Sequence, residues 1–442
     1  MTNTSPPFSR KQARIIKYAL AQLAGAKAYK PITSIEDLRA PFGRELRLTN
    51  NRTVLLTHRS VEHLERIVDT TVEANPYAGL ADYADIWSAS WKVLEELVSN
   101  GHMANDAIEW LGLLSARITP QIQLRHLVVP FVGIEFKDID DLRLGPFKLL
   151  RPSTRYFDAM GVDYAWADVP KMITGYRGRV LWLHGSVRGT RRAAERQFQT
   201  LADSIAGLLA VAAAVLLKSG ATTIFISPNM TGHDSRGNAT WFSWEEPSAN
   251  FATHGSGLRG LPFPIDANLR EQFNQVSTIT TAMRIFEAEK RTPLEEAVAR
   301  GFHWFADAHR DPTLVMQFVK YWSCIETFFS TDKVEITKSV SIGVAAVLVF
   351  GGYEFAPREE YANIKKRVAS LYGLRSRAVH GASRGHIVES DVAELSRYAA
   401  QLLLNAVSFV ECGYKRPDDI KRHSMRLNEQ IEQSRDAVKA GR

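Results

Sequence analysis

The chain has 442 residues, of which 45% are hydrophobic and 23% charged. These values are ordinary for a globular protein and exclude a wholly disordered or low-complexity chain, and the length favours two or three domains. The formal net charge is +7, and two cysteines, Cys324 and Cys412, are too few for a disulfide framework. We therefore expect reduced thiols and a cytoplasmic location.

Residues 1–120 are expected to form an N-terminal, mostly helical region. The first 30 residues carry six lysines and arginines and no acid. Such an arm can contact phosphates, or it can simply be the solvated face of an amphipathic helix. Apolar spacing and cap residues predict a helix over 9–26, two strands around a turn within 45–57, and helices over 60–73 (capped by Ser60), 85–99 and 104–118.

Residues 121–265 are expected to form a mixed α/β region. Strand-like composition marks 127–136 and 142–150, which we expect to pair, and then 180–184, 222–226 and 240–244. A long helix is predicted over 191–217. Its apolar run, from Ile205 to Leu217, is about 13 residues, whereas a membrane span needs roughly 20. We therefore expect a buried helix and no membrane association.

Residues 266–414 are expected to form an all-α domain, followed by a charged tail over 415–442 that is either a surface helix or frayed. Thr292-Pro-Leu-Glu295 is a strong helix start, because it combines a capping box with proline at the first helical position. The next helix, over 314–330, is apolar around most of its circumference, and Glu326 is its one acid. Further helices are predicted to open at 332–335, at Pro357 and at Asp391-x-x-Glu394.

Cations and an imidazole are concentrated within 371–381. Arg375 stands five positions before His380, with Arg377 between them. In an ideal helix, five residues rotate by about 500°, so Arg375 and His380 would point roughly 140° apart. Gly373 is expected to end one helix and let a second begin near Arg375, so that both side chains reach one cleft.

This pair of side chains suits RNA cleavage. An imidazole can take the proton from the attacking 2′-hydroxyl or give one to the leaving oxygen, and a guanidinium can neutralise charge growing on the phosphate. Ser376 can orient His380 or the phosphate. His386 is a weaker candidate for a second acid or base, and two copies of the motif facing each other in a dimer would supply two histidines.

A structural role for the same residues is the alternative. Arg375 and Arg377 can pair with Glu326 or with the adjacent carboxylates of 359–360, and His380 can close its helix.

Three strings resemble the ApeA-like branch of HEPN domains: Trp322-x-x-x-Glu326, Glu335-Ile-Thr, and Leu371-Tyr-x-Leu-Arg-Ser-x-x-Val-His-Gly381. The similarity covers about residues 290–412. The resemblance implies an all-helical module that dimerises and joins two Arg–His motifs into a metal-independent endoribonuclease site, with roles in toxins, phage defence and RNA processing. It makes Arg375 and His380 the catalytic candidates. Many active members have Asn or Asp where this chain has Ser376, and other members do not cleave RNA.

Other common sites lack support in the sequence. There is no phosphate-binding Gly-x-x-x-x-Gly-Lys-Ser/Thr loop, no Cys-x-x-Cys and no His-Glu-x-x-His, so no cofactor or metal is expected. We thus predict an α+β protein, with a mixed α/β N-terminal region before a HEPN-like helical bundle. Its expected partners are RNA and a second copy of itself. The alternative is a non-catalytic helical module that binds RNA or protein.

Overall fold

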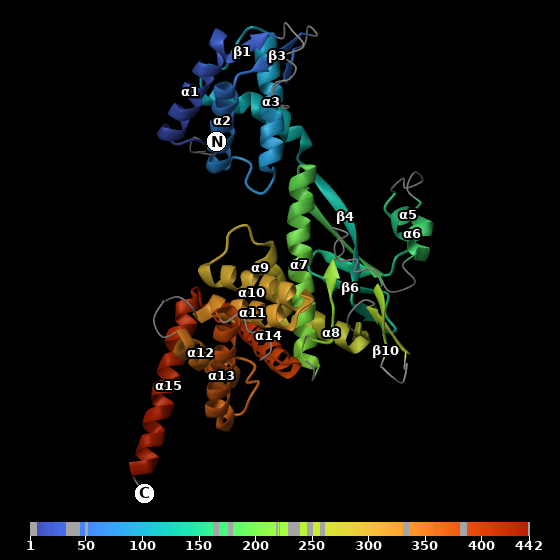
Figure 1. The fold of residues 1–442 in the computed structure, drawn as a ribbon, viewed down its shortest axis with the longest axis vertical. Helices are drawn as coiled ribbons and strands as arrows, with labels where there is room; N and C mark the ends of the chain where they lie inside the picture. The colour runs from blue at the N-terminus through green and yellow to red at the C-terminus, as the bar shows by residue number, and fades with distance from the viewer. Residues whose placement is uncertain are drawn as a thin grey trace. The chain divides into compact units, whose positions relative to one another are not determined.

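The protein has an α+β fold, seen in a computed structural model (Figure 1). The chain divides into two compact units, unit 1 (Met1–Leu127 and Ser186–Phe198) and unit 2 (Val128–Gly185 and Gln199–Arg442). The structure describes residues 7–31, 45–48, 52–161, 168–175, 180–217, 220, 222–228, 239–244, 251–256, 261–329, 336–380 and 387–440.

Unit 1 combines a small antiparallel sheet, in strand order β1-β3-β2, with packed helices. Its elements are α1 (Arg10–Leu23), a 3-10 turn (Ala26–Ala28), β1 (Tyr29–Pro31), β2 (Glu45–Arg47), β3 (Thr53–Leu56), α2 (His58–Ala74), α3 (Tyr83–Ser99), α4 (Ala107–Ile118) and a second 3-10 turn (Thr119–Gln121).

The start of α2 differs from the prediction. Its cap is Thr57, whose hydroxyl accepts a hydrogen bond from the Ser60 nitrogen at 3.4 Å. Ser60 was the expected cap, but it lies inside the first turn, where its buried hydroxyl donates to the Ala28 carbonyl at 2.9 Å. This bond ties α2 to the segment that follows α1.

A five-stranded sheet in the order β6-β7-β8-β4-β9 corrects the expected strand pairing. Residues 142–150 were expected to pair as one strand with 127–136. They instead form a hairpin whose turn contains Gly145 at φ 57°, and β8 lies between that hairpin and β4. The strands are β4 (Gln123–Val132), β6 (Asp141–Leu144), β7 (Phe147–Leu150), β8 (Val180–Gly189) and β9 (Ser227–Pro228).

Two shorter pairings complete the strands. β5 (Ile134–Phe136) runs parallel to β12 (Phe263–Ile265), and β10 (Ala239–Trp244) pairs with β11 (Phe251–Ser256). The strand expected over 222–226 is reduced to one bridge between Ile224 and Leu261. Two short helices, α5 (Thr154–Ala159) and α6 (Val169–Gly175), lie between β7 and β8 in the sequence.

The long helix α7 (Arg191–Leu216) is a core helix, as predicted. Among the described helices it alone is long and apolar enough to cross a membrane, but 61% of its most apolar window is buried inside the protein. Gly207 allows close packing against α10 (Pro293–Arg310), since a Cβ there would lie 2.5 Å from the Phe302 carbonyl oxygen. The apolar surface of α7 is therefore used in protein packing.

The C-terminal part of unit 2 is helical, and α10, α11, α12, α13 and α14 pack together (Figure 1). The start of α10 is as predicted, because Thr292 and Glu295 form the expected capping box. The remaining helices are α8 (Ala267–Gln275), α9 (Ser277–Glu287), α11 (Leu314–Phe329), α12 (Ile336–Phe350), a 3-10 turn (Arg358–Glu360), α13 (Tyr361–His380), α14 (Glu389–Glu411) and α15 (Pro417–Ala440). The helix opening expected at 332–335 lies outside the described residues.

The charged tail forms helix α15, and its first half is docked on the bundle. Ile420, Ser424 and Asn428, four residues apart and so on one face, are all buried. The Asn428 side-chain oxygen accepts hydrogen bonds from Tyr361 at 3.0 Å and from Lys365 at 2.8 Å. Both donors belong to α13, so α15 braces the helix that carries Arg375.

Candidate functional site on helix α13

The helix that carries Arg375 is unbroken. α13 runs from Tyr361 to His380 and contains Gly373 in its interior, so the expected helix break at this glycine is wrong. An interior glycine costs a helix only about 1 kcal/mol relative to alanine, and tertiary packing readily outweighs that cost. Here Leu371 and Val368 are buried on the same helix and hold it in place.

A continuous α13 separates Arg375 from His380. Five helical residues place the two positions roughly 140° apart around the axis, so one copy of α13 does not direct both toward the same point. His380 is the last residue of α13, and its side chain lies outside the described atoms, as does the whole of His386. The structure therefore locates Arg375 in atomic detail and gives only the helical position of His380.

Glu326 on α11 is the ion-pair partner of Arg375. The Arg375 Nη2 atom lies 3.2 Å from Glu326 Oε2, and the Tyr372 hydroxyl donates to Glu326 Oε1 at 3.0 Å. Tyr372 and Arg375 are three residues apart and so share one face of α13. Both carboxylate oxygens are used, which fixes the orientation of the carboxylate.

Aromatic side chains pack against this polar cluster. The rings of Trp322 and Tyr372 meet edge to face with centroids 5.1 Å apart, and the Arg375 guanidinium carbon lies 5.7 Å from the Tyr372 ring centroid. Such contacts are favourable because ring edges and cations are attracted to the negative ring face. The strings around 322–326 and 371–375, which carry the family resemblance, thus contact each other directly.

The cluster is partly shielded from water. The side chain of Arg375 is 24% exposed and that of Glu326 17% exposed. Burial raises the pKa of Tyr372, the Glu326 carboxylate raises it further, and the Arg375 cation opposes the change. The Nε atom of Arg375 is buried and has no hydrogen-bond partner among the described residues.

The last turns of α13 beyond Arg375 are open to solvent. Ser376 and Arg377 are exposed, and Val379 is 46% exposed. Arg377 lies along the helix over Gly373, because its Nη1 atom would be 3.8 Å from a Cβ at that glycine. No described contact joins Ser376 to Arg375, so the orienting role expected for Ser376 stays a prediction.

The other carboxylates considered as partners of Arg375 and Arg377 have different surroundings. Glu360 accepts a hydrogen bond from Asn363 at 3.1 Å, and Glu359 is exposed on the 3-10 turn before α13. Of the three carboxylates weighed from the sequence, Glu326 is thus the one that pairs with Arg375.

A second set of ion pairs joins α13 to α14. Arg367 lies 2.8 Å from Asp391 and 2.7 Å from Glu394. These two acids were expected to open α14, but the helix already begins at Glu389. α13 is thus bonded to α11, α14 and α15.

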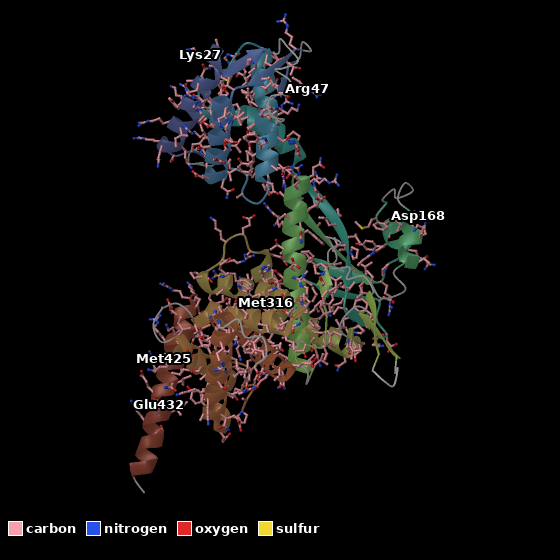
Figure 2. All side chains as sticks on the ribbon, viewed as in Figure 1. Lys27, Arg47, Asp168, Met316, Met425 and Glu432 are labelled. Atoms are coloured by element: carbon pink, nitrogen blue, oxygen red, sulfur yellow. The ribbon has the colours of Figure 1, made fainter. Side chains whose placement is uncertain are left out.

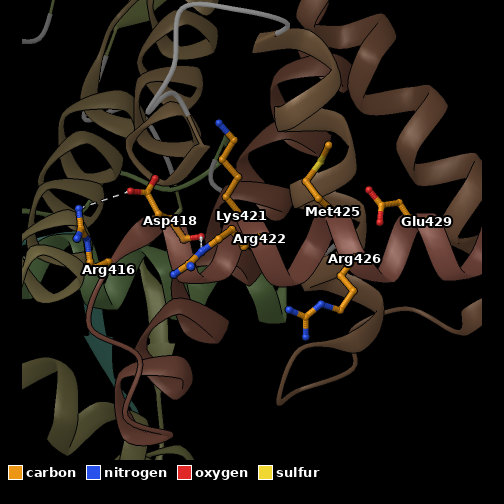
Figure 3. A pocket seen from close by; sticks show the side chains of 7 residues that line it. All are labelled: Arg416, Asp418, Lys421, Arg422, Met425, Arg426 and Glu429. Atoms are coloured by element: carbon orange, nitrogen blue, oxygen red, sulfur yellow. Dashed lines mark hydrogen bonds and ion pairs between the residues drawn. The ribbon is translucent and has the colours of Figure 1, made fainter.

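Two grooves of the described surface lie apart from Arg375. One of about 680 Å³ is lined by residues of β6, the hairpin turn, α8 and α9, and it includes Glu287, whose carboxyl pKa is raised by burial. Another, of about 670 Å³, follows α15 (Figure 3). Its lining is charged and partly self-paired, with Arg416 3.8 Å from Asp418. The α15 groove is lined by Arg416, Asp418, Lys421, Arg422, Met425, Arg426 and Glu429.

Tyr372 is the member of the cluster to which sequence reasoning gave no role. Its spacing of three from Arg375 is the signal that it shares the same helix face, but the partner on that face comes from another helix.

Both cysteines are free, with Cys324 buried and Cys412 exposed. Within the described ranges, no three His, Cys, Asp or Glu side chains gather as metal ligands.

No family model matches the chain, and neither do any of the curated proteins or solved structures compared with it.

Proposed function

We propose that this chain is a metal-independent endoribonuclease of HEPN type, acting as a cytoplasmic homodimer in phage defence or as a toxin-like protein. The observation that supports it best is the fixed presentation of Arg375. Its guanidinium is paired with Glu326, which Tyr372 also bonds, near the solvent-exposed end of α13. Fixed cationic donors of this kind stabilise charge that develops on a phosphate.

In the proposed reaction, the 2′-hydroxyl of one nucleotide attacks the adjacent phosphorus. The imidazole of His380 takes the hydroxyl proton, or gives a proton to the departing 5′-oxygen. Arg375 neutralises the charge that grows on the non-bridging oxygens. Such acid–base assistance typically contributes 10²–10⁴-fold to the rate.

The proposed site uses two copies of the chain because of where Arg375 and His380 lie on α13. Within one α13, Arg375 and His380 point roughly 140° apart, so a shared phosphate is reached more readily by Arg375 of one copy and His380 of a second copy. The exposed Val379, one residue before His380, offers apolar surface for that contact. A twofold dimer contains two such half-sites.

A second candidate function is a non-catalytic module that binds RNA or protein. The Glu326 salt bridge favours it, because a carboxylate 3.2 Å from the guanidinium offsets the charge that a phosphate would need. In that role, Arg375 joins α11 to α13 and contributes to stability alone.

Cleavage of a labelled single-stranded RNA in the presence of EDTA separates the two functions. We expect wild-type protein to cut the RNA, and Arg375→Ala and His380→Ala each to lose the activity while remaining folded. Arg377→Gln is the matched control, since it removes an exposed cation two residues away. A wild-type protein that never cuts RNA would leave only the non-catalytic function.

Mixing the two inactive variants tests the shared site. If Arg375 acts with His380 of the other copy, half of the dimers become mixed and each mixed dimer contains one intact half-site, so about a quarter of wild-type activity returns. If both residues act within one copy, mixing restores nothing. Size-exclusion chromatography with light scattering establishes whether the dimer is present in the same samples.

A further inference from the structure

The outer face of α1 in unit 1 is strongly cationic. Arg10, Lys11, Arg14 and Lys17 are all exposed, and α1 contains no acid. Nitrogen-tipped side chains project outward from this helix (Figure 2). The opposite face of α1 is fully used in the core, where Ile16, Ala19, Leu20 and Leu23 are at most 1% exposed.

The neighbouring helix α2 adds further basic side chains. Arg59, His63 and Arg66 are spaced by four and three residues and so share a helix face. The acids Glu65 and Asp69 lie on another face, where they raise the pKa of Tyr83 in addition to the effect of burial. Glu62, three residues after Arg59 and four before Arg66, lies on the cationic face, so one carboxylate partly offsets its three basic side chains.

Most of these cations are not engaged in an ion pair. Within the described part of the chain, Arg10, Lys11, Arg14, Arg59 and Arg66 form no salt bridge. Other exposed cations of unit 1 do have one: Lys92 pairs with Glu95 at 2.6 Å, Arg117 with Glu96 at 2.5 Å, and Arg191 with Glu195 at 3.0 Å.

The surroundings of His63 include two arginines and one opposing carboxylate. The pKa of His63 is lowered, first by burial and then by Arg66 and Arg59, with Glu62 opposing. His63 also contacts an exposed aromatic side chain, Tyr18, which is 56% exposed. The two rings lie edge to face with centroids 6.0 Å apart.

We infer that this basic face, formed by Arg10, Lys11, Arg14, Arg59 and Arg66 around Tyr18 and His63, is a binding surface for single-stranded RNA. The cations contact phosphates, and Tyr18 stacks on a base. Arg10 to Lys17 covers roughly 10 Å along the helix axis, enough to follow a strand past more than one nucleotide. The choice of RNA rests on the proposed function, for which the basic face would supply substrate capture in a different unit from Arg375.

The same features argue against two other partners. A membrane-surface helix needs a free apolar face, but the apolar face of α1 is buried in the core. A purely electrostatic contact with an acidic protein gives no use for an exposed tyrosine among the cations, whereas base stacking on an aromatic ring is a standard feature of single-strand binding.

Fluorescence anisotropy with a 2′-O-methylated, labelled single-stranded RNA tests the inference. The methyl group removes the attacking hydroxyl, so binding is measured without cleavage. For the triple variant Arg10→Gln, Arg14→Gln, Arg59→Gln, we expect Kd to rise at least tenfold at about 0.1 M salt, and the slope of log K against log salt to fall by about 2. The matched control, Lys92→Gln, Arg117→Gln, Arg191→Gln, removes the same charge from paired cations of the same unit and leaves Kd nearly unchanged.

Two variants test whether Tyr18 stacks on a base. Tyr18→Ala is expected to weaken binding about tenfold through lost stacking, and Tyr18→Phe to retain it. Equal losses in both triple variants would mean that only net charge matters and would overturn the inference. So would a triple variant that binds RNA normally, or one whose only defect is binding to vesicles containing anionic lipid. A protein that binds RNA through this face but never cleaves it would overturn the proposed nuclease and leave this inference intact.

Discussion

The carboxylate of Glu326 and the guanidinium of Arg375 form a 3.2 Å salt bridge between α11 and α13, and Tyr372 bonds to the other oxygen of the same carboxylate. Removing one partner of a partly buried pair leaves the other charge uncompensated. The cluster therefore has a stability role whether or not Arg375 also acts in catalysis.

Glu326→Gln is expected to lower the free energy of unfolding by about 1–3 kcal/mol. The amide keeps an acceptor for Tyr372 and removes the charge that pairs with Arg375. Chemical denaturation measures the loss, and Glu359→Gln, on the exposed 3-10 turn, is the control with the same chemical change. A double-mutant cycle with Arg375→Gln should give a coupling energy clearly above zero, and additive losses would mean that the salt bridge contributes nothing.

Gly373→Ala is expected to stabilise the protein by up to about 1 kcal/mol. A Cβ at this position would meet its nearest neighbour, Arg377 Nη1, at 3.8 Å, which is an ordinary contact, and alanine favours the unbroken helix. Thermal unfolding followed by circular dichroism gives the change in Tm. A lower Tm would support a break at Gly373, and with it the converging geometry that the sequence alone suggested.

The sequence predicted most helices of the bundle because their signals are local. Thr292 and Glu295 mark the start of α10 correctly, and the apolar run from Ile205 marks a buried helix. Pairings between strands that are far apart in the sequence were harder to predict. The insertion of β8 between β7 and β4, for example, depends on a strand that begins about 30 residues after β7 ends.

The candidate site was predicted in part for the same reason. The sequence proposed three carboxylates as partners of Arg375 and could not choose among them, since the choice depends on how α11 packs against α13. The helix break predicted at Gly373 is wrong because glycine is only a weak helix breaker when its helix is packed on several sides.

Gly207→Ala is expected to destabilise the protein by about 1–3 kcal/mol, the opposite sign to Gly373→Ala. The added Cβ would lie 2.5 Å from the Phe302 backbone oxygen, so α7 and α10 would have to move apart. Denaturant unfolding measures the loss. Gly112→Ala in α4 is the control for adding a Cβ to a helix where there is space, because no atom lies within 4 Å of that Cβ position. Wild-type stability in Gly207→Ala would show that the two helices are more loosely packed than described.

His309 on α10 is expected to make stability depend on pH. The residue is 3% exposed, with Nδ1 3.1 Å from the Phe305 oxygen, and Nε2 2.8 Å from the Ile226 oxygen and 3.2 Å from the Ile226 nitrogen. Burial, together with the charge of Arg310, lowers its pKa to about 4, while the two backbone contacts and Asp307 oppose the change. The folded protein therefore keeps the ring neutral at a pH where the unfolded chain protonates it.

Because this pKa is lowered on folding, the unfolded chain binds more protons between about pH 4 and 6.5, and stability must fall as the pH falls through that window. A shift from 6.5 to about 4 corresponds to about 3 kcal/mol, present above pH 6.5 and lost near pH 4. His309→Gln should lower stability at pH 7 and flatten the dependence across this window in urea unfolding. His303→Gln, which replaces an exposed histidine of the same helix, should keep the wild-type slope, and an unchanged slope in His309→Gln would assign the pH dependence to other groups.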